Sequence, residues 1–75
     1  MVKMAETQNE KILYTVKEVS EIMHTNQAFV YSLIKAKLLP VLKLGSYKIR
    51  REALFRFFEE NEGKDLTNPL NVTVL

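Results

Sequence analysis

The chain has 75 residues, 47% of them hydrophobic, and a formal net charge of +2. That length corresponds to one small domain, and the composition is typical of a folded chain rather than a disordered one. There is no cysteine for a disulfide or a thiolate metal site. His24 is the single histidine, so the chain lacks the ligands of a zinc cage and the residues of a histidine-based triad. A domain this small has little room for a deep catalytic pocket. We therefore expect a binding module without a metal or cofactor, not an enzyme.

Apolar runs in this sequence are only a few residues long, whereas a membrane-spanning helix needs about 20 apolar residues. Residues 1–11 are polar without a period and lack the apolar stretch of a secretory signal. We expect them to form a disordered N-terminal segment. The sequence predicts a cytoplasmic protein with no membrane association.

Positive charge is concentrated in the middle of the chain. Residues 35–56 carry seven lysines and arginines against Glu52 alone, a sum of +6, whereas residues 1–34 sum to −1 and residues 57–75 to −3. Basic clustering of this kind is the electrostatic footprint of nucleic-acid binding. The alternative is an ordinary solvated surface.

A first helix is predicted to begin after Thr15. Thr15 and Glu18 have the spacing of a capping box, in which each side chain bonds the other residue's backbone N–H. The helix should end near Met23, with His24 as the left-handed residue that follows it.

A second helix is predicted to begin at Asn26, a favourable N-cap residue. Because only about three residues connect the two helices, the pair has the form of a helix-turn-helix. The apolar stripe of the second helix consists of Val30, Leu33 and Ile34. The opposite face carries Ala28, Ser32 and Lys35, with Tyr31 on the flank.

A β-hairpin should follow Pro40, which prevents further helix. Residues 41–44 and 47–50 read as strands joined by Gly45 and Ser46 as a two-residue turn. That register pairs Leu44 with Tyr47, Lys43 with Lys48, Leu42 with Ile49 and Val41 with Arg50. Because strand side chains alternate, Leu42, Leu44, Tyr47 and Ile49 should face the helices, and Lys43, Lys48 and Arg50 should project together from the other face around Val41.

A third helix is expected from about Glu52 to Asn61, with a core face of Leu54, Phe57 and Phe58 and with Gly63 at its C-terminal cap. The predicted fold is thus α+β: a small winged helix-turn-helix with three helices and a two-stranded hairpin wing, spanning residues 12–63. Residues 64–75 form a C-terminal tail outside the core. The tail either frays or adds its alternating segment as a strand to the exposed hairpin edge, which would support self-association.

Four motifs in the chain resemble the excisionase-type members of the MerR-like winged-helix group. They are Thr-Val-Lys-Glu-Val-Ser-Glu at 15–21, Val-Tyr-Ser-Leu-Ile at 30–34, Leu-Pro-Val-Leu-Lys-Leu-Gly at 39–45 and Tyr-Lys-Ile-Arg-Arg at 47–51. The resemblance covers the segment from Tyr14 to Phe58, in the family's order and with nearly its spacing.

This resemblance implies sequence-selective binding of double-stranded DNA, with the second helix in the major groove and the hairpin wing alongside. Relatives act as recombination directionality factors of phages and mobile elements, or as small transcription regulators. The expected partners are therefore duplex DNA, a recombinase or integrase, and further copies of the chain that associate weakly on DNA. The candidate DNA-binding residues are Asn26, Gln27, Ala28, Tyr31, Ser32, Lys35, Lys43, Ser46, Lys48 and Arg50.

Three functional hypotheses stay open at this point. The first is an excisionase-like protein, and the second is a transcription regulator that uses the same surface. The third is a protein-interaction adaptor that has lost DNA binding, favoured by Ala28 and Phe29 where the family often has polar residues. Among single sites, Tyr31 is either a phosphate contact or packing at the edge of the core, and the wing lysines either bind DNA or protect an edge strand from aggregation.

Overall fold

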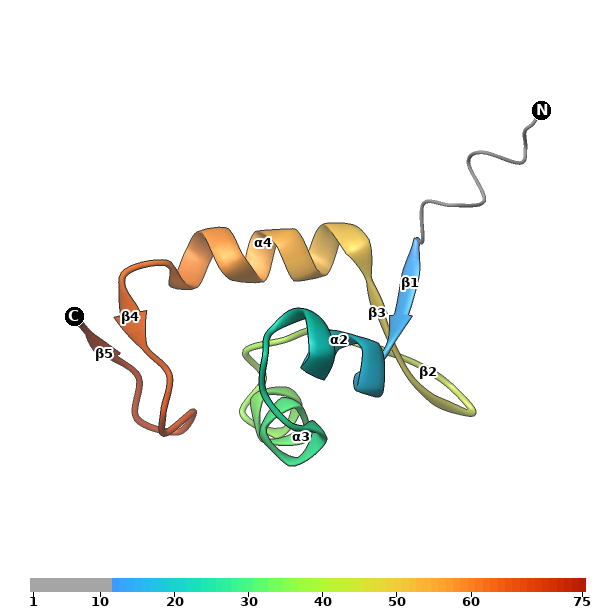
Figure 1. Ribbon diagram of the computed structural model, residues 1–75, viewed down its shortest axis with the longest axis horizontal. Coiled ribbons are helices and arrows are strands. Elements are labelled where there is room, and N and C mark those ends of the chain that lie inside the picture. The colour runs from blue at the N-terminus through green and yellow to red at the C-terminus, as the bar shows by residue number, and fades with distance from the viewer. Residues whose placement is uncertain (1–11) are drawn as a thin grey trace.

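The computed structural model describes residues 12–75, and the predicted disorder of residues 1–11 lies outside this part of the chain. Within it, helix α4 lies across the pair formed by α2 and α3, and a small sheet closes one side (Figure 1). The architecture confirms the predicted α+β winged helix-turn-helix. The elements in chain order are β1 (Leu13–Thr15), α2 (Val16–Ile22), α3 (Gln27–Lys35), β2 (Leu42–Leu44), β3 (Ser46–Arg50), α4 (Arg51–Asn61), β4 (Lys64–Asp65) and β5 (Thr73–Val74).

Both predicted N-caps are present. The Glu18 backbone N–H donates to the Thr15 hydroxyl at 3.1 Å, and the Thr15 backbone N–H donates to the Glu18 carboxylate at 2.9 Å. These two bonds form the capping box that starts α2. At α3, the Phe29 backbone N–H donates to the Asn26 side-chain oxygen at 2.8 Å. Each cap satisfies an amide that the helix itself leaves unpaired.

Helices α2 and α3 end in the same way, in a Schellman motif. After α2, the backbone N–H of Thr25 donates to the Ser20 carbonyl at 2.8 Å, and His24 has a φ of 58°. After α3, the N–H of Leu38 donates to the Leu33 carbonyl at 3.0 Å, and Lys37 has a φ of 65°. Both left-handed positions are usually glycine. The prediction for His24 is confirmed, and Lys37 repeats it at the end of the next helix.

The sheet has three strands in the order β1-β3-β2, all antiparallel neighbours. The hairpin β2–β3 is the expected wing, whereas β1 is an addition that the sequence did not predict. β1 pairs Tyr14 with Ile49, and Ile49 is fully buried. Because β1 runs directly into the capping box of α2, the sheet is tied to the helix-turn-helix at this point.

The predicted register of the wing is wrong by one residue. The observed pairs are Leu42 with Lys48, Lys43 with Tyr47, and Leu44 with Ser46. Gly45 alone, at a φ of 81°, makes the turn. A shift of one residue moves every side chain of a strand to the other face.

The two faces of β2 are therefore exchanged relative to the prediction. Leu42 and Leu44 lie on the outer face and are exposed, not packed on the helices. Lys43 lies on the helix side, while Val41 packs against the core. Lys48 and Arg50 still share the outer face of β3, so the predicted cluster of three cations is divided between the faces.

The core lies between the three helices and the inner face of the sheet. Its buried residues are Val16, Val19, Val30, Leu33, Ile34, Leu39, Ile49, Leu54 and Phe57. This set includes most of the apolar positions predicted for the second and third helices. Phe58, predicted in the core, is instead 38% exposed, because α4 extends beyond α2 and α3 toward its C-terminal end (Figure 1).

Residues 64–75 fold back on themselves beside the C-terminal end of α4. β4 pairs with β5, and the backbone N–H of Leu75 donates to the Gly63 carbonyl at 2.9 Å. Thus β5 pairs with β4 inside the tail. One of the two expectations had placed this segment at the edge of the wing, and β5 does not lie there. Leu66, within the predicted tail, is partly buried and packs against the core. Among residues 12–75, no helix is long and apolar enough to span a bilayer.

Candidate nucleic-acid interface

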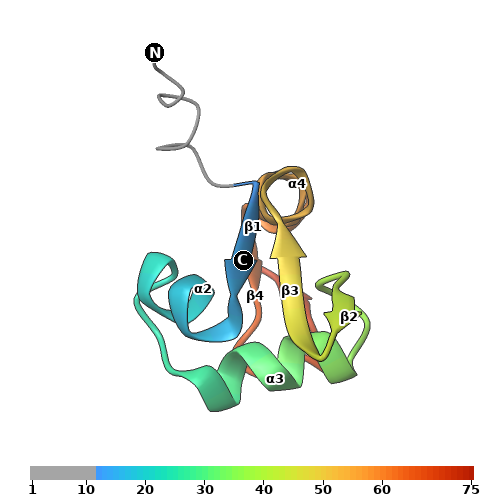
Figure 2. The same ribbon diagram turned by 90° about the vertical axis from the view of Figure 1, so that its right-hand side faces the viewer.

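A crease runs between α3 and the wing. Figure 2 shows α3 along the base of the molecule, with the wing beside it and α4 on the far side. Two hollows, of about 510 and 180 Å³, mark this crease, and Tyr47 of β3 lines both. We use "the α3–wing crease" for these two hollows together with Lys43, whose ammonium group lies against Tyr47.

The smaller hollow brings together residues from three elements. Gln27 and Tyr31 line it from α3, Ser46 and Tyr47 from β3, and Lys17 from the first turn of α2. Gln27, Tyr31 and Ser46 are all candidate residues from the sequence, so the fold gathers three of the ten into one place. Side-chain amides, hydroxyls and ammonium groups are the donors that proteins direct at phosphate oxygens and base edges.

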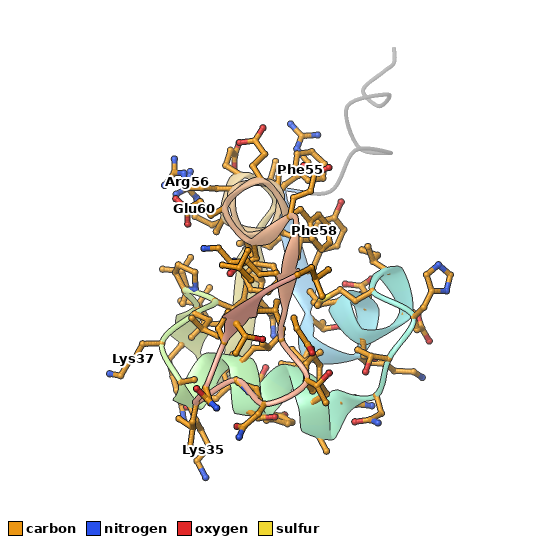
Figure 3. The ribbon with its side chains drawn as sticks, turned by 90° about the vertical axis from the view of Figure 1, so that its left-hand side faces the viewer. Lys35, Lys37, Phe55, Arg56, Phe58 and Glu60 are labelled. Carbon is orange, nitrogen blue, oxygen red and sulfur yellow. The ribbon has the colours of Figure 1, made fainter. Side chains whose placement is uncertain are left out.

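The larger hollow lies at the C-terminal end of α3. Lys35 and Lys37 line it together with Tyr47 and apolar residues of the connection to the wing. Both lysine side chains extend away from the body of the protein in Figure 3. Lys37 has a left-handed conformation, which turns the chain here, and its side chain lines the same hollow as that of Lys35.

Aromatic rings form the floor between the two hollows. The ring centres of Tyr31 and Tyr47 are 6.1 Å apart, with their planes tilted by 54°. The Nζ atom of Lys43 lies 4.9 Å from the centre of the Tyr47 ring, a cation–π contact. Tyr31, at 43% exposed, is therefore part of the surface of the crease.

Candidates on α3 differ in how free their polar groups are. Gln27, Ala28 and Lys35 are exposed, and Ala28 leaves a shallow place where another surface can approach the helix closely. The side-chain oxygen of Asn26 is already occupied by its capping bond, which leaves its amide group to donate. The Ser32 hydroxyl is half-buried and donates to carbonyls of its own helix, at 2.9 Å to Phe29.

Lys48 and Arg50 lie on the outer face of the sheet and line neither hollow, although Lys48 contacts the edge of the crease through Ser46. The Lys48 ammonium donates to the Ser46 hydroxyl at 2.6 Å. Arg50 forms an exposed ion pair with Glu52 at 3.4 Å. The structure therefore does not bring these two candidates together with Lys43.

The prediction from sequence missed three residues of the crease: Lys17, Lys37 and Tyr47. Lys17 is distant in sequence and reaches the crease only because α2 packs beside α3. Tyr47 packs against the core as predicted, but the strand pattern did not indicate that it also lines the crease. Lys37 belongs to the block of positive charge at residues 35–56, and that block was the feature of the sequence that could have identified it as a site residue.

Electrostatically, the crease is suited to a polyanion. Its lining includes Lys17, Lys35 and Lys37, and Lys43 adjoins it, whereas no carboxylate from the described part of the chain lines either hollow. Cations on a surface that a helix and a ribbon share can neutralise phosphates on both sides of a groove.

Comparison with known proteins agrees with this geometry. The family model described as a helix-turn-helix domain matches residues 13–62, which is two thirds of the chain and includes every element of the crease. No curated protein and no solved structure matches significantly. The matched segment begins at β1 and ends after α4, and helix-turn-helix membership supports DNA as the partner. This chain therefore belongs to the helix-turn-helix domain family.

Proposed function

We propose that the protein binds double-stranded DNA sequence-selectively and acts as an excisionase-like recombination directionality factor. In this proposal, α3 enters the major groove and the wing lies along the adjacent backbone. The recombinase is the second partner, and the protein's task is to shape or coat the DNA beside it. The four motifs shared with excisionase-type proteins support the choice of this role within the family.

The observation that carries DNA binding is the composition of the α3–wing crease. Cations and hydrogen-bond donors come from α2, α3 and both wing strands, and no carboxylate from residues 12–75 lines either hollow. A net charge of only +2 is sufficient, because within residues 12–75 no acidic side chain lines the two hollows.

Different residues are proposed to supply affinity and specificity. Gln27 and Lys35 reach base edges from the exposed side of α3, while Ala28 permits close approach to the groove. Asn26, Tyr31, Ser32 and Ser46 complete the surface with contacts to sugar and phosphate. Lys43 neutralises a phosphate from inside the crease.

Lys48 and Arg50 have a separate place in the proposal. They contact phosphates where the duplex follows the wing around to its outer face. Contacts on both faces of a ribbon require DNA that bends toward the protein, which is the deformation expected of a protein that shapes a recombination site.

Self-association on DNA is a further part of the proposal. The outer edge of β2 has no partner strand among the described residues, and such an edge accepts a strand from a neighbour. Weak contacts between copies that already lie side by side on DNA give cooperative binding, because the first copy raises the local concentration of the second.

The test is a gel-shift titration of the full chain on duplex DNA from its own genomic locus, at several salt concentrations, followed by a recombination assay with any integrase encoded beside it. The proposal expects salt-dependent, cooperative binding and a shift from integration to excision. Binding to a promoter without an effect on recombination would instead identify a transcription regulator. Failure to bind any duplex at low salt would identify the adaptor that the sequence left open.

A further inference from the structure

A second groove lies on the other side of the molecule, between the end of α2 and the C-terminal half of α4. Its walls are apolar: Ile22 and Met23 from α2, Phe57 and Phe58 from α4, and Leu66 from the start of the tail. Ile22 and Phe58 are 42% and 38% exposed, although both are large apolar side chains. We call this surface, together with the adjoining hollow described next, the α2–α4 groove.

The groove continues past Ile22 into a smaller hollow on the N-terminal side. Tyr14, Glu18 and Glu21 line that hollow with Ile22, which is common to both. The two parts have volumes of about 510 and 340 Å³. The two hollows meet at Ile22, and α4 lines only the larger of them.

Negative charge surrounds this apolar floor. Glu18 and Glu21 line one part, Glu59 and Glu62 line the other, and no lysine or arginine of residues 12–75 lines either. The sign of the charge is thus opposite to that of the α3–wing crease, which is lined by lysines. Because DNA phosphates are repelled by such a surface, the α2–α4 groove stays available while the crease holds a duplex.

The two flanks of α4 carry different kinds of side chain. In Figure 3, Phe55 and Phe58 extend from the flank that faces α2, whereas Arg56 and Glu60 extend from the opposite flank. Phe55 is 53% exposed and lengthens the apolar surface by one helical turn beyond Phe58. An exposed aromatic stripe next to a groove is the usual mark of a protein-binding surface, since a soluble domain gains nothing from leaving it in water.

We propose that the α2–α4 groove docks a basic amphipathic helix of a partner protein. An apolar stripe on that helix fills the floor against Ile22 and Phe58, and its flanking lysines and arginines meet Glu21, Glu59 and Glu62 at the rim. This is the helix-in-groove mode of recognition, with the charge pattern selecting the partner and its orientation. A basic partner is itself suited to lie on DNA, so the groove gives the protein a means of holding a second DNA-bound protein beside its own site.

The test uses the full chain, labelled with ¹⁵N, without DNA. The probe is a synthetic helical peptide of about 18 residues, or five turns, with leucine at i, i+3, i+4 and i+7 and lysine or arginine elsewhere. A matched peptide keeps the leucines and replaces the basic residues by glutamate. We expect the basic peptide to shift the amide signals of Ile22, Met23 and residues 57–62, and the acidic peptide to bind at least about tenfold more weakly, because like charges then meet at the rim.

A pair of variants on the same helix separates the groove from general charge attraction. Glu59→Lys reverses one charge of the rim, whereas Glu60→Lys makes the same change in net charge on the opposite flank. Both positions are exposed, so thermal unfolding should show that the variants remain folded. The proposal expects Glu59→Lys to lose about tenfold or more in affinity for the basic peptide and Glu60→Lys to lose less than about threefold.

Several results would overturn the proposal. They are equal binding of both peptides, no binding, signal changes centred outside the groove, and equal losses in Glu60→Lys and Glu59→Lys. Concentration-dependent shifts at the same amides without peptide would assign the groove to a second copy of the chain. Since no DNA is present, the outcome is independent of whether the protein binds DNA as proposed above.

Discussion

Lys43 lies over the ring of Tyr47, with its Nζ atom 4.9 Å from the ring centre, because the two residues are direct partners across the wing. In the register expected from sequence, Lys43 would oppose Lys48, and the two ammonium groups would repel each other. The observed register replaces that repulsion by a cation–π contact and places the charge on the side of α3. The crease between α3 and the wing owes its wing-side cation to this one pairing.

Replacing Lys43 by alanine should therefore reduce the salt dependence of DNA binding. One lost phosphate contact flattens the slope of log affinity against log salt by about 0.9, and a total slope of about −3 to −6 is expected for the unmodified chain. Lys64→Ala is the control, because it removes an exposed lysine of β4 that lies outside the proposed interface. The measurement is fluorescence anisotropy with a labelled duplex, and an unchanged slope in folded Lys43→Ala would show that the crease does not hold a phosphate at this position.

Replacing Gln27 by alanine should relax sequence preference at one base position. Gln27 is exposed in the first turn of α3, where a recognition helix meets base edges. A bidentate contact contributes about 1–3 kcal/mol of discrimination against the wrong base. Selection from a randomised duplex pool, compared between Gln27→Ala and the unmodified chain, measures this directly. Identical preferences would indicate that α3 docks in a different orientation.

Lys37→Gly should stabilise the protein. A residue with a side chain in the left-handed conformation costs about 1–2 kcal/mol, of which glycine recovers a part after its larger entropy loss on folding. We expect a gain of about 0.5–1 kcal/mol in the free energy of unfolding, read from urea denaturation. Lys37→Ala is the control, since it removes the same charge but keeps the strain. A gain from alanine equal to that from glycine would contradict this explanation.

Local signals in the sequence predicted most of the helical part. The capping box of Thr15 and Glu18, the Asn26 cap and the positive φ of His24 are each determined by residues within three or four positions of one another. The buried face of α3 followed from helical spacing. Such features need no knowledge of the rest of the fold.

Pairings between distant residues could not be predicted in the same way. β1 has only three residues, and its partner strand follows more than 30 positions later. In the wing, a turn made by Gly45 alone and a turn made by Gly45 and Ser46 fit the local sequence equally well, yet they place Lys43 on opposite faces. For the candidate site, sequence therefore indicated the basic region and the outward face of α3, but not that Lys17, Tyr31 and Tyr47 lie together.

The C-terminal hairpin should loosen in acid. The backbone N–H and the hydroxyl of Thr67 donate to the Asp65 carboxylate at 2.9 and 2.6 Å. These bonds hold the pKa of Asp65 below its ordinary value of 3.8, and the bond from the hydroxyl has the larger effect. Because the pKa is lowered in the folded state, this stabilisation is present above pH 3.8 and is lost as the pH falls through the folded-state pKa.

An NMR titration of the Asp65 side chain and the Thr67 amide checks this account of the hairpin. The midpoint should lie below 3.8 in the unmodified chain and move upward in Thr67→Val, which keeps the shape of the side chain but loses its hydroxyl. A midpoint at or above 3.8 in the unmodified chain would show that the turn does not form in solution.

Site-directed photo-crosslinking tests the central claim, that DNA lies in the α3–wing crease, most directly. The sequence has no cysteine, so Ala28→Cys on the exposed face of α3 and Glu60→Cys on the far flank of α4 can each be labelled at a single position. With a short photoreactive reagent and duplex DNA from the protein's own locus, we predict strong crosslinking from position 28 and little from position 60. Equal crosslinking, or a preference for position 60, would contradict the account.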